Sequence, residues 1–428
     1  MMRKEVIRKG YYNLILNSIW VGILATLLGV SLKNSTAFFE ESLLENIEHF
    51  PVLYIFLPSI GITIIYFTRK YLFKGKQNKG IKEIFNTLEK RKDELPFYKI
   101  PSHYINGFLT VVFGGSTGIE VSTVVATAAI GSSVYKKDKV ANAYKTELIC
   151  AGVAAGVTTL FGSPIAGLLF AIEVISRKVN KTLFLSCAIS IAIAQTFIFF
   201  FDNKKLFDFE VFNWNYHAIP YMILLSILAG IVAVFFTKSV IFIKTKFAQI
   251  KSNFIRVNTG ALLVGLGIFI FPALYGDSYH AIPELILTPN YQTISIGFIA
   301  SLVFIVFLKP IAASLTLGAG GDGGVFAPSI VTGAILGIFI ALFCNHFFDT
   351  ELIVLNFALI GAAAMLSAAI HAPLTALFLT CNIVDNGFAL FIPLLIGVYI
   401  AKYIAIFLCN YNVYTYEKGK KKLSIQLK

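Results

Sequence analysis

Long apolar runs constrain this chain more than any other feature. The clearest cover residues 12–32, 148–175, 183–201 and 388–408. A helix needs roughly 20 apolar residues to cross the hydrocarbon core of a bilayer, and each of these runs is about that long or longer. Composition agrees, because 57% of the residues are hydrophobic and only 14% are charged, whereas soluble domains carry about 25% charged residues. We therefore predict an all-α polytopic membrane protein with about ten to twelve membrane segments.

The charged residues predict the orientation of the chain. The formal net charge is +13, but no basic helix or aromatic-basic ribbon accompanies it, so no nucleic-acid partner is expected. Lys and Arg gather in 1–10 and after residue 416, and the positive-inside rule places both short basic termini in the cytoplasm of the cell membrane. The second run, 51–67, is followed by a basic stretch with Lys70, Lys74, Lys76 and Lys79, which is typical of a cytoplasmic loop. An acidic loop on the opposite side is predicted after the first run, with Glu40, Glu41, Glu45 and Glu48.

Other residue types exclude several kinds of site. The first apolar run is too long for a cleavable signal peptide and is expected to serve as the insertion signal itself. The histidines form no HExxH pattern, and no paired aspartates or Ser/Lys pair mark an intramembrane enzyme, so no enzymatic activity is predicted. The cysteines have no CxxC spacing and no histidine partners, so we predict packing roles for them and no metal site. They are Cys150, Cys187, Cys344, Cys381 and Cys409.

The chain also repeats itself. Residues 114–122 align with 320–328 and share three glycines in register. Further along, 152–166 aligns with 361–375 through a Gly-Ala stretch followed by a proline. Small residues and prolines are common in membrane helices and can align by chance. Two blocks in the same order at similar spacing favour an internal duplication instead.

The duplication predicts where a functional site lies. We expect a single transmembrane domain over 1–428, with one repeat at about 51–200 and the other at about 220–410. Matched Gly and Pro interruptions in apolar segments are typical of transporters whose site lies at the interface of two repeats. The alignment places this site near Glu120 and Phe326.

Two features near these positions indicate an anion pathway. The glycine-rich run 318–324 precedes an apolar stretch, and free backbone amides at such a helix start attract anions, which makes the amides of Val325 and Phe326 candidate donors. Glu120 lies among small apolar residues without a basic neighbour, and an ionisable residue in a membrane segment is by default a functional hypothesis. Glu120 is predicted to imitate an anion and block the pathway; the alternative is a buried carboxyl bonded to backbone amides.

Several motifs resemble the CLC chloride channel and transporter family. Lys309-Pro310, followed by 314–318 and by Gly-Gly-Val-Phe-Ala-Pro at 323–328, resembles the family segment in which GGVFAP opens a helix at the anion site. Residues 118–122 are similar to the family's GREGP segment. Three further blocks agree in order, at 163–173, 272–282 and 413–416.

This resemblance implies a CLC-type fold of two inverted-topology repeats with tilted and broken helices, in a homodimer with one anion pathway in each subunit. It assigns gating to Glu120, amide donors to Val325 and Phe326, and a hydroxyl donor to Tyr414. Tyr414 could instead belong to an interfacial tyrosine belt. The chain stops soon after Tyr416, so CBS domains are not expected. Other residues carried over are Lys79, Gly80, Ile119 and Val121 at the anion site and Gly118, Gly323, Gly324 and Pro328 along the pathway backbone.

The chain departs from the family pattern near the site. Lys79 replaces a serine that normally meets the central anion. Its ammonium could tighten anion binding, or it could extend to the cytoplasm, which we favour because the surrounding loop is basic. Ile119 and Ser122 replace the usual Arg and Pro beside the gating Glu.

The third departure concerns proton coupling. In exchanging members an acid that relays protons follows the position of Glu173, which we interpret as a structural carboxyl at a helix end, but here Val174 follows it. Valine binds no proton, so the main prediction is passive conduction of chloride or a similar small anion, gated by Glu120, without a cofactor. The alternative is an anion/proton antiporter of the same family, and a more remote one is a proton-coupled solute carrier of another fold.

Overall fold

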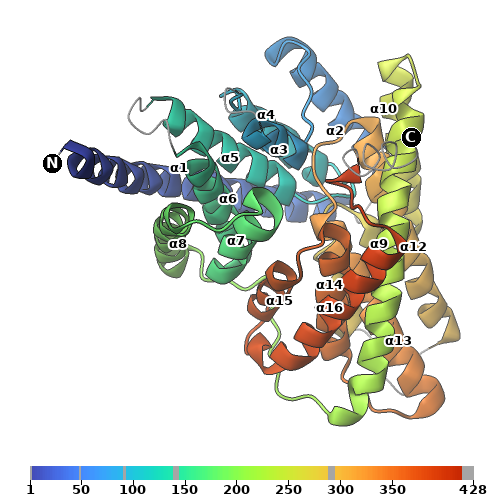
Figure 1. Cartoon of the computed structure of the whole chain (residues 1–428). Helices are drawn as coiled ribbons and strands as arrows, with labels where there is room; N and C mark the ends of the chain where they lie inside the picture. The colour runs from blue at the N-terminus through green and yellow to red at the C-terminus, as the bar shows by residue number, and fades with distance from the viewer. Residues whose placement is uncertain (1, 48–49, 90–92, 138–143, 288–294, 417–428) are drawn as a thin grey trace, which may run out of the picture.

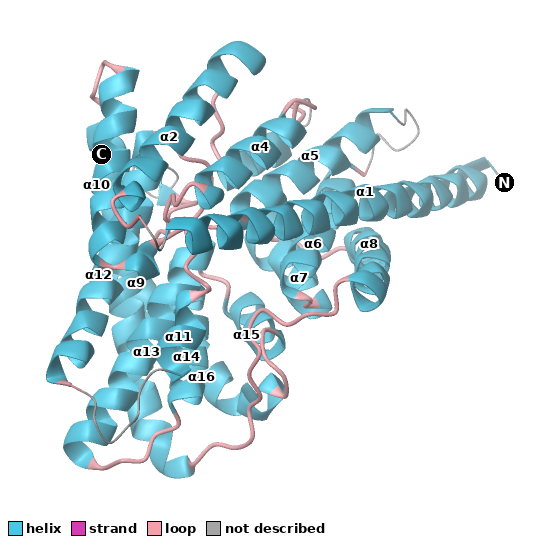
Figure 2. Ribbon diagram, turned by 180° about the vertical axis from the view of Figure 1, so that it is seen from behind, coloured by secondary structure: helices cyan, strands magenta, loops and turns pink. Residues whose placement is uncertain are grey.

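The chain forms a helical membrane domain. A computed structural model describes residues 2–47, 50–89, 93–137, 144–287 and 295–416. These residues form sixteen α-helices and no β-strand, so the predicted all-α class is confirmed. Figure 2 accordingly draws helices joined by loops. Basic residues of the tail after 416 and Glu48 lie outside the described residues.

The helices fall into two halves along the chain. The first half contains α1 (Met2–Ile47), α2 (Leu53–Phe67), η1 (Thr68–Leu72), α3 (Ile81–Glu89), α4 (Lys99–Val112), α5 (Glu120–Lys137), α6 (Lys145–Phe161), α7 (Pro164–Phe170), η2 (Ala171–Ser176) and α8 (Lys181–Phe201). The second half contains η3 (Tyr216–Ala218), α9 (Ile219–Ala248), α10 (Asn253–Ile270), η4 (Pro272–Leu274), α11 (Ala281–Leu287), α12 (Ile296–Ala319), α13 (Phe326–Phe348), α14 (Val354–Ile370), α15 (Pro373–Asn382), η5 (Gly387–Leu390) and α16 (Phe391–Leu408).

Seven helical segments within the described residues are long and apolar enough to cross a membrane. Shorter apolar helices occupy 164–176, 354–370 and 373–382. Large apolar side chains such as Trp20, Phe242 and Phe407 are exposed on the outside, where a lipid phase would cover them. The seven segments are 7–47, 181–201, 216–248, 253–270, 296–319, 326–348 and 387–408.

Helix α1 corrects one prediction. It does not end near residue 32 but continues to Ile47, so Glu40, Glu41 and Glu45 lie on its last turns rather than in a loop. The carboxylates do not stop the helix because Glu and Leu are good helix formers. In Figures 1 and 2, α1 lies at a steep angle to the long helices of the second half, such as α9 and α12. This fits a tilted helix, because its 46 residues are longer than a bilayer is thick.

The apolar run 148–175 is broken rather than continuous. Helix α6 ends at Gly162 in the left-handed conformation, and α7 starts at Pro164 with Ser163 as its cap. The second half repeats this break, since α14 ends at the left-handed His371 and α15 starts at Pro373. Helices α7 and α15 pack against each other. Some of the predicted membrane segments are therefore pairs of short helices rather than single continuous spans.

Reciprocal hydrogen bonds relate the two halves. The Oγ1 of Thr110 accepts from the amide of Asp322 at 2.9 Å, and the Oγ1 of Thr316 accepts from the amide of Ser116 at 3.1 Å. Thr110 matches Thr316 and Ser116 matches Asp322 at one offset of 206 residues (316 − 110 and 322 − 116). Such an exchange of equivalent bonds is what a two-fold relation between inverted repeats produces.

Helix packing extends this correspondence to the long helices. Helix α1 packs against α6 and α8 as α9 packs against α14 and α16. Helices α1 and α9 therefore have corresponding neighbours in the two halves.

The interior is packed closely. All five cysteines are free and buried, as predicted for packing residues. At the crossing of α13 and α14, a Cβ added at Gly333 or Gly361 would lie about 2 Å from the other glycine's carbonyl oxygen. Two glycines therefore allow these backbones to touch.

Candidate functional site

Two glycine segments meet at the interface of the halves. Gly118 and Gly324 form an isolated antiparallel bridge, and each lies two residues before a helix, α5 starting at Glu120 and α13 at Phe326. The N-termini of α5 and α13 therefore converge. The first amides of a helix have no acceptor within that helix, and they lie at the positive end of its dipole.

The glycine-rich loop between α12 and α13 is anchored on the other half. The guanidinium of Arg69 donates to the carbonyl oxygen of Gly320 at 2.7 Å. Asn78 donates to a carboxylate oxygen of Asp322, and the Nδ1 of the fully buried His103 lies 3.4 Å from the same oxygen. These contacts hold the loop in place ahead of the N-terminus of α13.

Glu120 is buried at the start of α5, with 4% of its surface exposed. Its Oε1 accepts a hydrogen bond from the hydroxyl of Tyr279 at 2.8 Å. Its Oε2 is buried, has no hydrogen-bond partner among the described residues, and lies against Gly118, where an added Cβ would be only 2.1 Å away. The carboxylate is thus held by one phenol and fits against a position where only glycine leaves room.

A cavity of about 550 Å³ reaches Glu120 from one side of the molecule. We call it the acidic cavity. Lys33 and His280 also line it, and Lys33 is paired with Asp202 at 2.8 Å. Its carboxylates are those of Glu40, Glu41, Glu45, Glu120, Asp277 and Glu284.

A second cavity, of about 320 Å³, reaches the glycine loop and Val121. We call it the basic cavity, and Asp322 is an acidic group on its wall. Its cations attract an anion, as a funnel of like charges does. They belong to Arg69, Lys79, Lys82, Lys244 and Arg256.

Most of the predicted site residues line one of the two cavities. Ile119 and Glu120 line the acidic cavity. The basic cavity contains Lys79, Gly80, Val121, Gly323, Gly324, Val325 and Tyr414. Glu120 and Val121, adjacent in sequence, therefore face different cavities. Phe326 and Pro328 line neither; they are buried in the first turn of α13.

Two residues of the basic cavity differ in their surroundings. The hydroxyl of Tyr414 is buried and finds no hydrogen-bond partner in the part of the chain that the structure describes, and a Cβ added at Gly324 would lie 3.7 Å from it. Lys79 is exposed in the loop before α3, and its backbone amide donates to the carboxylate of Glu83. The Lys79 ammonium is therefore not enclosed beside Tyr414.

Comparison with known families decides the assignment. The profile of the family described as "Voltage gated chloride channel" matches residues 60–406, most of the chain. The chain belongs to this family, the CLC family. It is therefore a multi-pass membrane protein of a family that transports small anions, and the remote alternative of a carrier with another fold is excluded.

Relatives and solved structures agree with this assignment. The chain is 27% identical over 410 residues to the protein named H(+)/Cl(-) exchange transporter ClcA of Yersinia pestis bv. Antiqua (strain Angola), covering 92% of this chain and 85% of that one. Its structure resembles that of a slow cyanobacterial Cl−/H+ antiporter, with a TM-score of 0.80, 20% identity, and coverage of 97% and 99%. It also resembles a CLC-type fluoride/proton antiporter, with a TM-score of 0.76, 22% identity, and coverage of 94% and 96%. The CLC-type fold is thereby shown.

Two contacts in this CLC chain were not predicted from its sequence. Tyr279 was part of a family-like block but was given no role, and only the fold brings its hydroxyl to Glu120. Lys309 also belongs to a family-like block but was given no role, and it lies inside α12 and is fully buried. Its ammonium donates to the hydroxyls of Ser116 and Ser278 at 2.8 and 2.6 Å and to the carbonyl oxygen of Gly276 at 2.9 Å.

Glu173 has a structural contact of the kind expected for it. Its carboxylate accepts from the backbone amides of Leu374 and Thr375 at 3.3 and 2.8 Å and from the Thr375 hydroxyl at 2.7 Å. It thereby satisfies free amides at the start of α15, where a negative charge also favours the helix dipole.

Proposed function

We propose that this protein exchanges chloride or a similar small anion for protons, with Glu120 as the gate of the anion pathway. The observation that carries the proposal is the position of this one carboxylate between the acidic and basic cavities. It lies where the N-termini of α5 and α13 meet, so an anion and the carboxylate compete for the same positively polarised helix starts.

The proposed pathway uses donors that add no full charge at the constriction. An anion enters the basic cavity, attracted by its cations. It then meets the amides of Val325 and Phe326 and the unpaired hydroxyl of Tyr414. Amides and a phenol bind a halide without trapping it as an ammonium would. Lys79 stays exposed and adds to the attraction at the mouth.

The gate opens when Glu120 leaves its place. The carboxylate blocks the anion while it is ionised and held by Tyr279. A proton from the acidic cavity neutralises it and weakens its attraction to the positive ends of α5 and α13, so that an anion takes its place. One residue then carries both the gate and the proton, and this links the two fluxes.

Protons that move between Glu120 and the side of the basic cavity need a route without a relaying acid at position 174, because valine binds no proton. A third cavity, of about 420 Å³, is lined by Glu173, Val174, His371 and Tyr414 among others. Tyr414 also lines the basic cavity. Water in the third cavity would carry protons to the neighbourhood of Tyr414, so valine at position 174 does not prevent coupling.

The comparisons favour exchange over the passive conduction that was the main prediction from sequence. The relatives at 27% identity are named as proton/chloride exchange transporters. They cover nearly the whole chain, including the gating segment and both glycine blocks. The missing acid at position 174 is a single difference and weighs less than this overall similarity.

The assembly belongs to the same proposal. We propose a homodimer in the cell membrane with one pathway in each subunit and both termini in the cytoplasm, so that the basic cavity opens inwards. Exposed apolar side chains on the spans supply surface for both lipid and a second copy. The mass of the detergent-solubilised particle, measured by light scattering, tests the dimer.

Transport into liposomes tests the function. Purified protein is reconstituted, an anion gradient is imposed, and anion and internal pH are followed together. We expect the anion gradient to drive protons uphill. Glu120→Gln should keep anion flux and abolish proton movement, whereas Glu41→Gln, exposed on the same cavity, should behave like the wild type. Anion flux without proton movement in the wild type would contradict exchange and restore passive conduction.

A further inference from the structure

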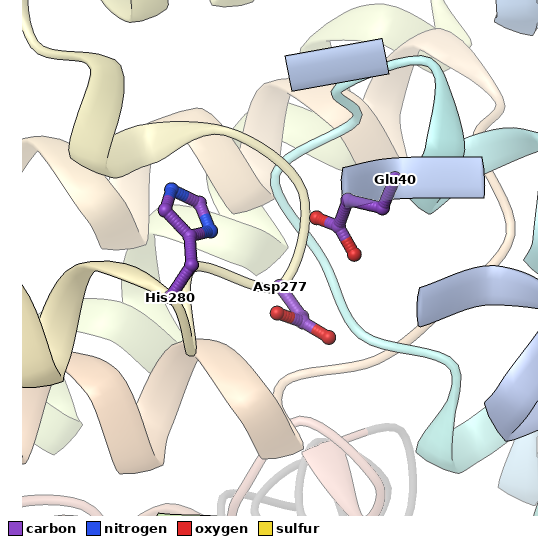
Figure 3. Close-up of side chains that lie close together, drawn as sticks. All are labelled: Glu40, Asp277 and His280. Carbon is purple, nitrogen blue, oxygen red and sulfur yellow. The ribbon is translucent and has the colours of Figure 1, made fainter. Parts of the chain in front are cut away.

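Three metal-binding side chains meet on the wall of the acidic cavity. Glu40 comes from the last turns of α1, and Asp277 and His280 come from the segment between η4 and α11. One ligand atom from each lies within 4.8 Å of those of the other two. Figure 3 shows the Glu40 carboxylate extending from its helix towards the space between Asp277 and His280.

Glu40 itself indicates a missing ligand. Only 7% of its surface is exposed, and its buried Oε1 has no hydrogen-bond partner within the described ranges of the chain. A buried carboxylate oxygen without a partner is costly. Gly276 leaves room for this oxygen, because a Cβ added at that position would lie only 1.9 Å from it. A cation between the three side chains would satisfy it.

The other two side chains give an ion access. Asp277 and His280 are partly exposed and line the cavity with Glu40. One oxygen of Asp277 accepts from the backbone amide of Tyr279 at 2.9 Å, which fixes the carboxylate as a second-layer contact does in metal sites. The cluster is therefore preorganised on one side and open on the other.

The ligand set selects the class of ion. Two carboxylates and one imidazole are the N and O ligands of Zn²⁺ and similar divalent transition metals, whereas Ca²⁺ and Mg²⁺ prefer oxygen ligands alone. Zn²⁺ sites with three protein ligands keep a further position for water. We propose that Glu40, Asp277 and His280 bind a divalent transition-metal cation of the Zn²⁺ class.

The charge of the cavity supports the proposal. Six carboxylates line it. Of the nearby cations, Lys33 pairs with Asp202 outside the cluster. Lys309, held by the oxygens of Ser116, Gly276 and Ser278, is close enough to Glu40 and Asp277 to offset part of their charge, but a single ammonium leaves most of the six carboxylates unbalanced. A divalent cation reduces this surplus of negative charge, which otherwise repels an anion on its way to Glu120.

A regulatory consequence rests on the proposed transport function. Asp277 holds the backbone of Tyr279, and the hydroxyl of Tyr279 holds Glu120. His280 of the metal site is also adjacent in sequence to Tyr279, the hydrogen-bond partner of the gate. Bound metal should lower the anion concentration that gives half-maximal transport, because the positive charge attracts the anion into the acidic cavity.

Metal binding is tested without transport. Zn²⁺ is titrated into the purified detergent-solubilised protein by calorimetry, and X-ray absorption identifies its ligands. We expect one Zn²⁺ per chain, with nitrogen and oxygen ligands, and an affinity that falls about tenfold or more in His280→Ala and in Glu40→Gln. Glu41→Gln and His217→Ala change an exposed carboxylate and an exposed histidine outside the cluster and should leave the affinity unchanged.

The outcomes separate the two proposals. Absence of saturable Zn²⁺ binding to the folded wild type, or equal binding by His280→Ala, overturns the metal site. If a variant does not elute as a monodisperse particle, X-ray absorption of the Zn²⁺-loaded wild type tests the site instead. Nitrogen and oxygen ligands support it, and the absence of a nitrogen ligand overturns it. In liposomes, Zn²⁺ should lower the half-saturating anion concentration by a few-fold in the wild type and not in His280→Ala, and an equal response overturns the regulatory step. Zn²⁺ binding without any anion transport would contradict the proposed function alone.

Discussion

The hydroxyl of Tyr279 and the Oε1 of Glu120 are joined by a hydrogen bond of 2.8 Å. The two residues lie 159 positions apart and come from different halves of the chain. The other carboxylate oxygen has no hydrogen-bond partner among the described residues, so this phenol is the group that most directly opposes displacement of the carboxylate.

Removing the hydroxyl should loosen the gate. A hydrogen bond to a charged group contributes about 1.5–3 kcal/mol, so Tyr279→Phe should shift the balance towards the displaced carboxylate by roughly tenfold or more. We expect faster anion efflux from liposomes. The control is Tyr275→Phe, which removes a buried hydroxyl that donates to the carbonyl oxygen of Val112 at 2.6 Å; it should lower thermal stability without raising flux. Unchanged efflux in Tyr279→Phe would show that this bond does not hold the gate.

Much of the fold could be predicted because it depends on local pattern. Apolar runs of sufficient length determine membrane helices, and glycines and prolines mark where they break. Gly162 and Pro164 end one helix and begin the next, as His371 and Pro373 do in the other half. The glycine-rich run before Phe326 also predicted the start of α13 correctly.

The rest depends on contacts between distant segments. No periodicity shows that Tyr279 reaches Glu120 or that Glu40 meets His280, because α1 and the segment before α11 are far apart in sequence. The metal cluster was missed for this reason, since ligand spacing identifies only sites built from one or two local segments. The contacts of Lys309 could not be predicted because its oxygen partners come from two other segments of the fold, one with Ser116 and one with Gly276 and Ser278.

Tyr414 should contribute directly to anion affinity. Its hydroxyl is buried without a partner on the wall of the basic cavity, and a donor to an anion is worth about 1.5–3 kcal/mol. Tyr414→Phe should weaken calorimetric halide binding by roughly tenfold. Tyr411→Phe changes a tyrosine that does not line the basic cavity and should keep normal affinity. Equal affinity of Tyr414→Phe and the wild type would remove the hydroxyl from the anion site.

Lys309 should be essential for folding rather than for transport chemistry. Lys309→Met removes the donor shared by two hydroxyls and a carbonyl oxygen in the fully buried interior. Each buried polar group left unpaired costs about 1–3 kcal/mol, so we expect a markedly lower yield of monodisperse protein and a lower midpoint of thermal denaturation. Lys238→Met alters an exposed lysine of α9 and should have little effect. A variant at position 309 with normal thermal stability would contradict this role.

The crossing of α13 and α14 should tolerate no side chain at its glycines. A Cβ at Gly361 would lie 2.0 Å from the carbonyl oxygen of Gly333, so Gly361→Ala must push the two backbones apart. Because α13 begins at the anion site with Phe326, we expect both a lower midpoint of thermal denaturation and weaker halide binding. At Gly267 in α10, an added Cβ would have only an ordinary contact at 3.5 Å. Gly267→Ala should therefore leave both measurements unchanged or raise stability by about 0.5–1 kcal/mol, and equal behaviour of the two variants would show that close backbone contact at this crossing is dispensable.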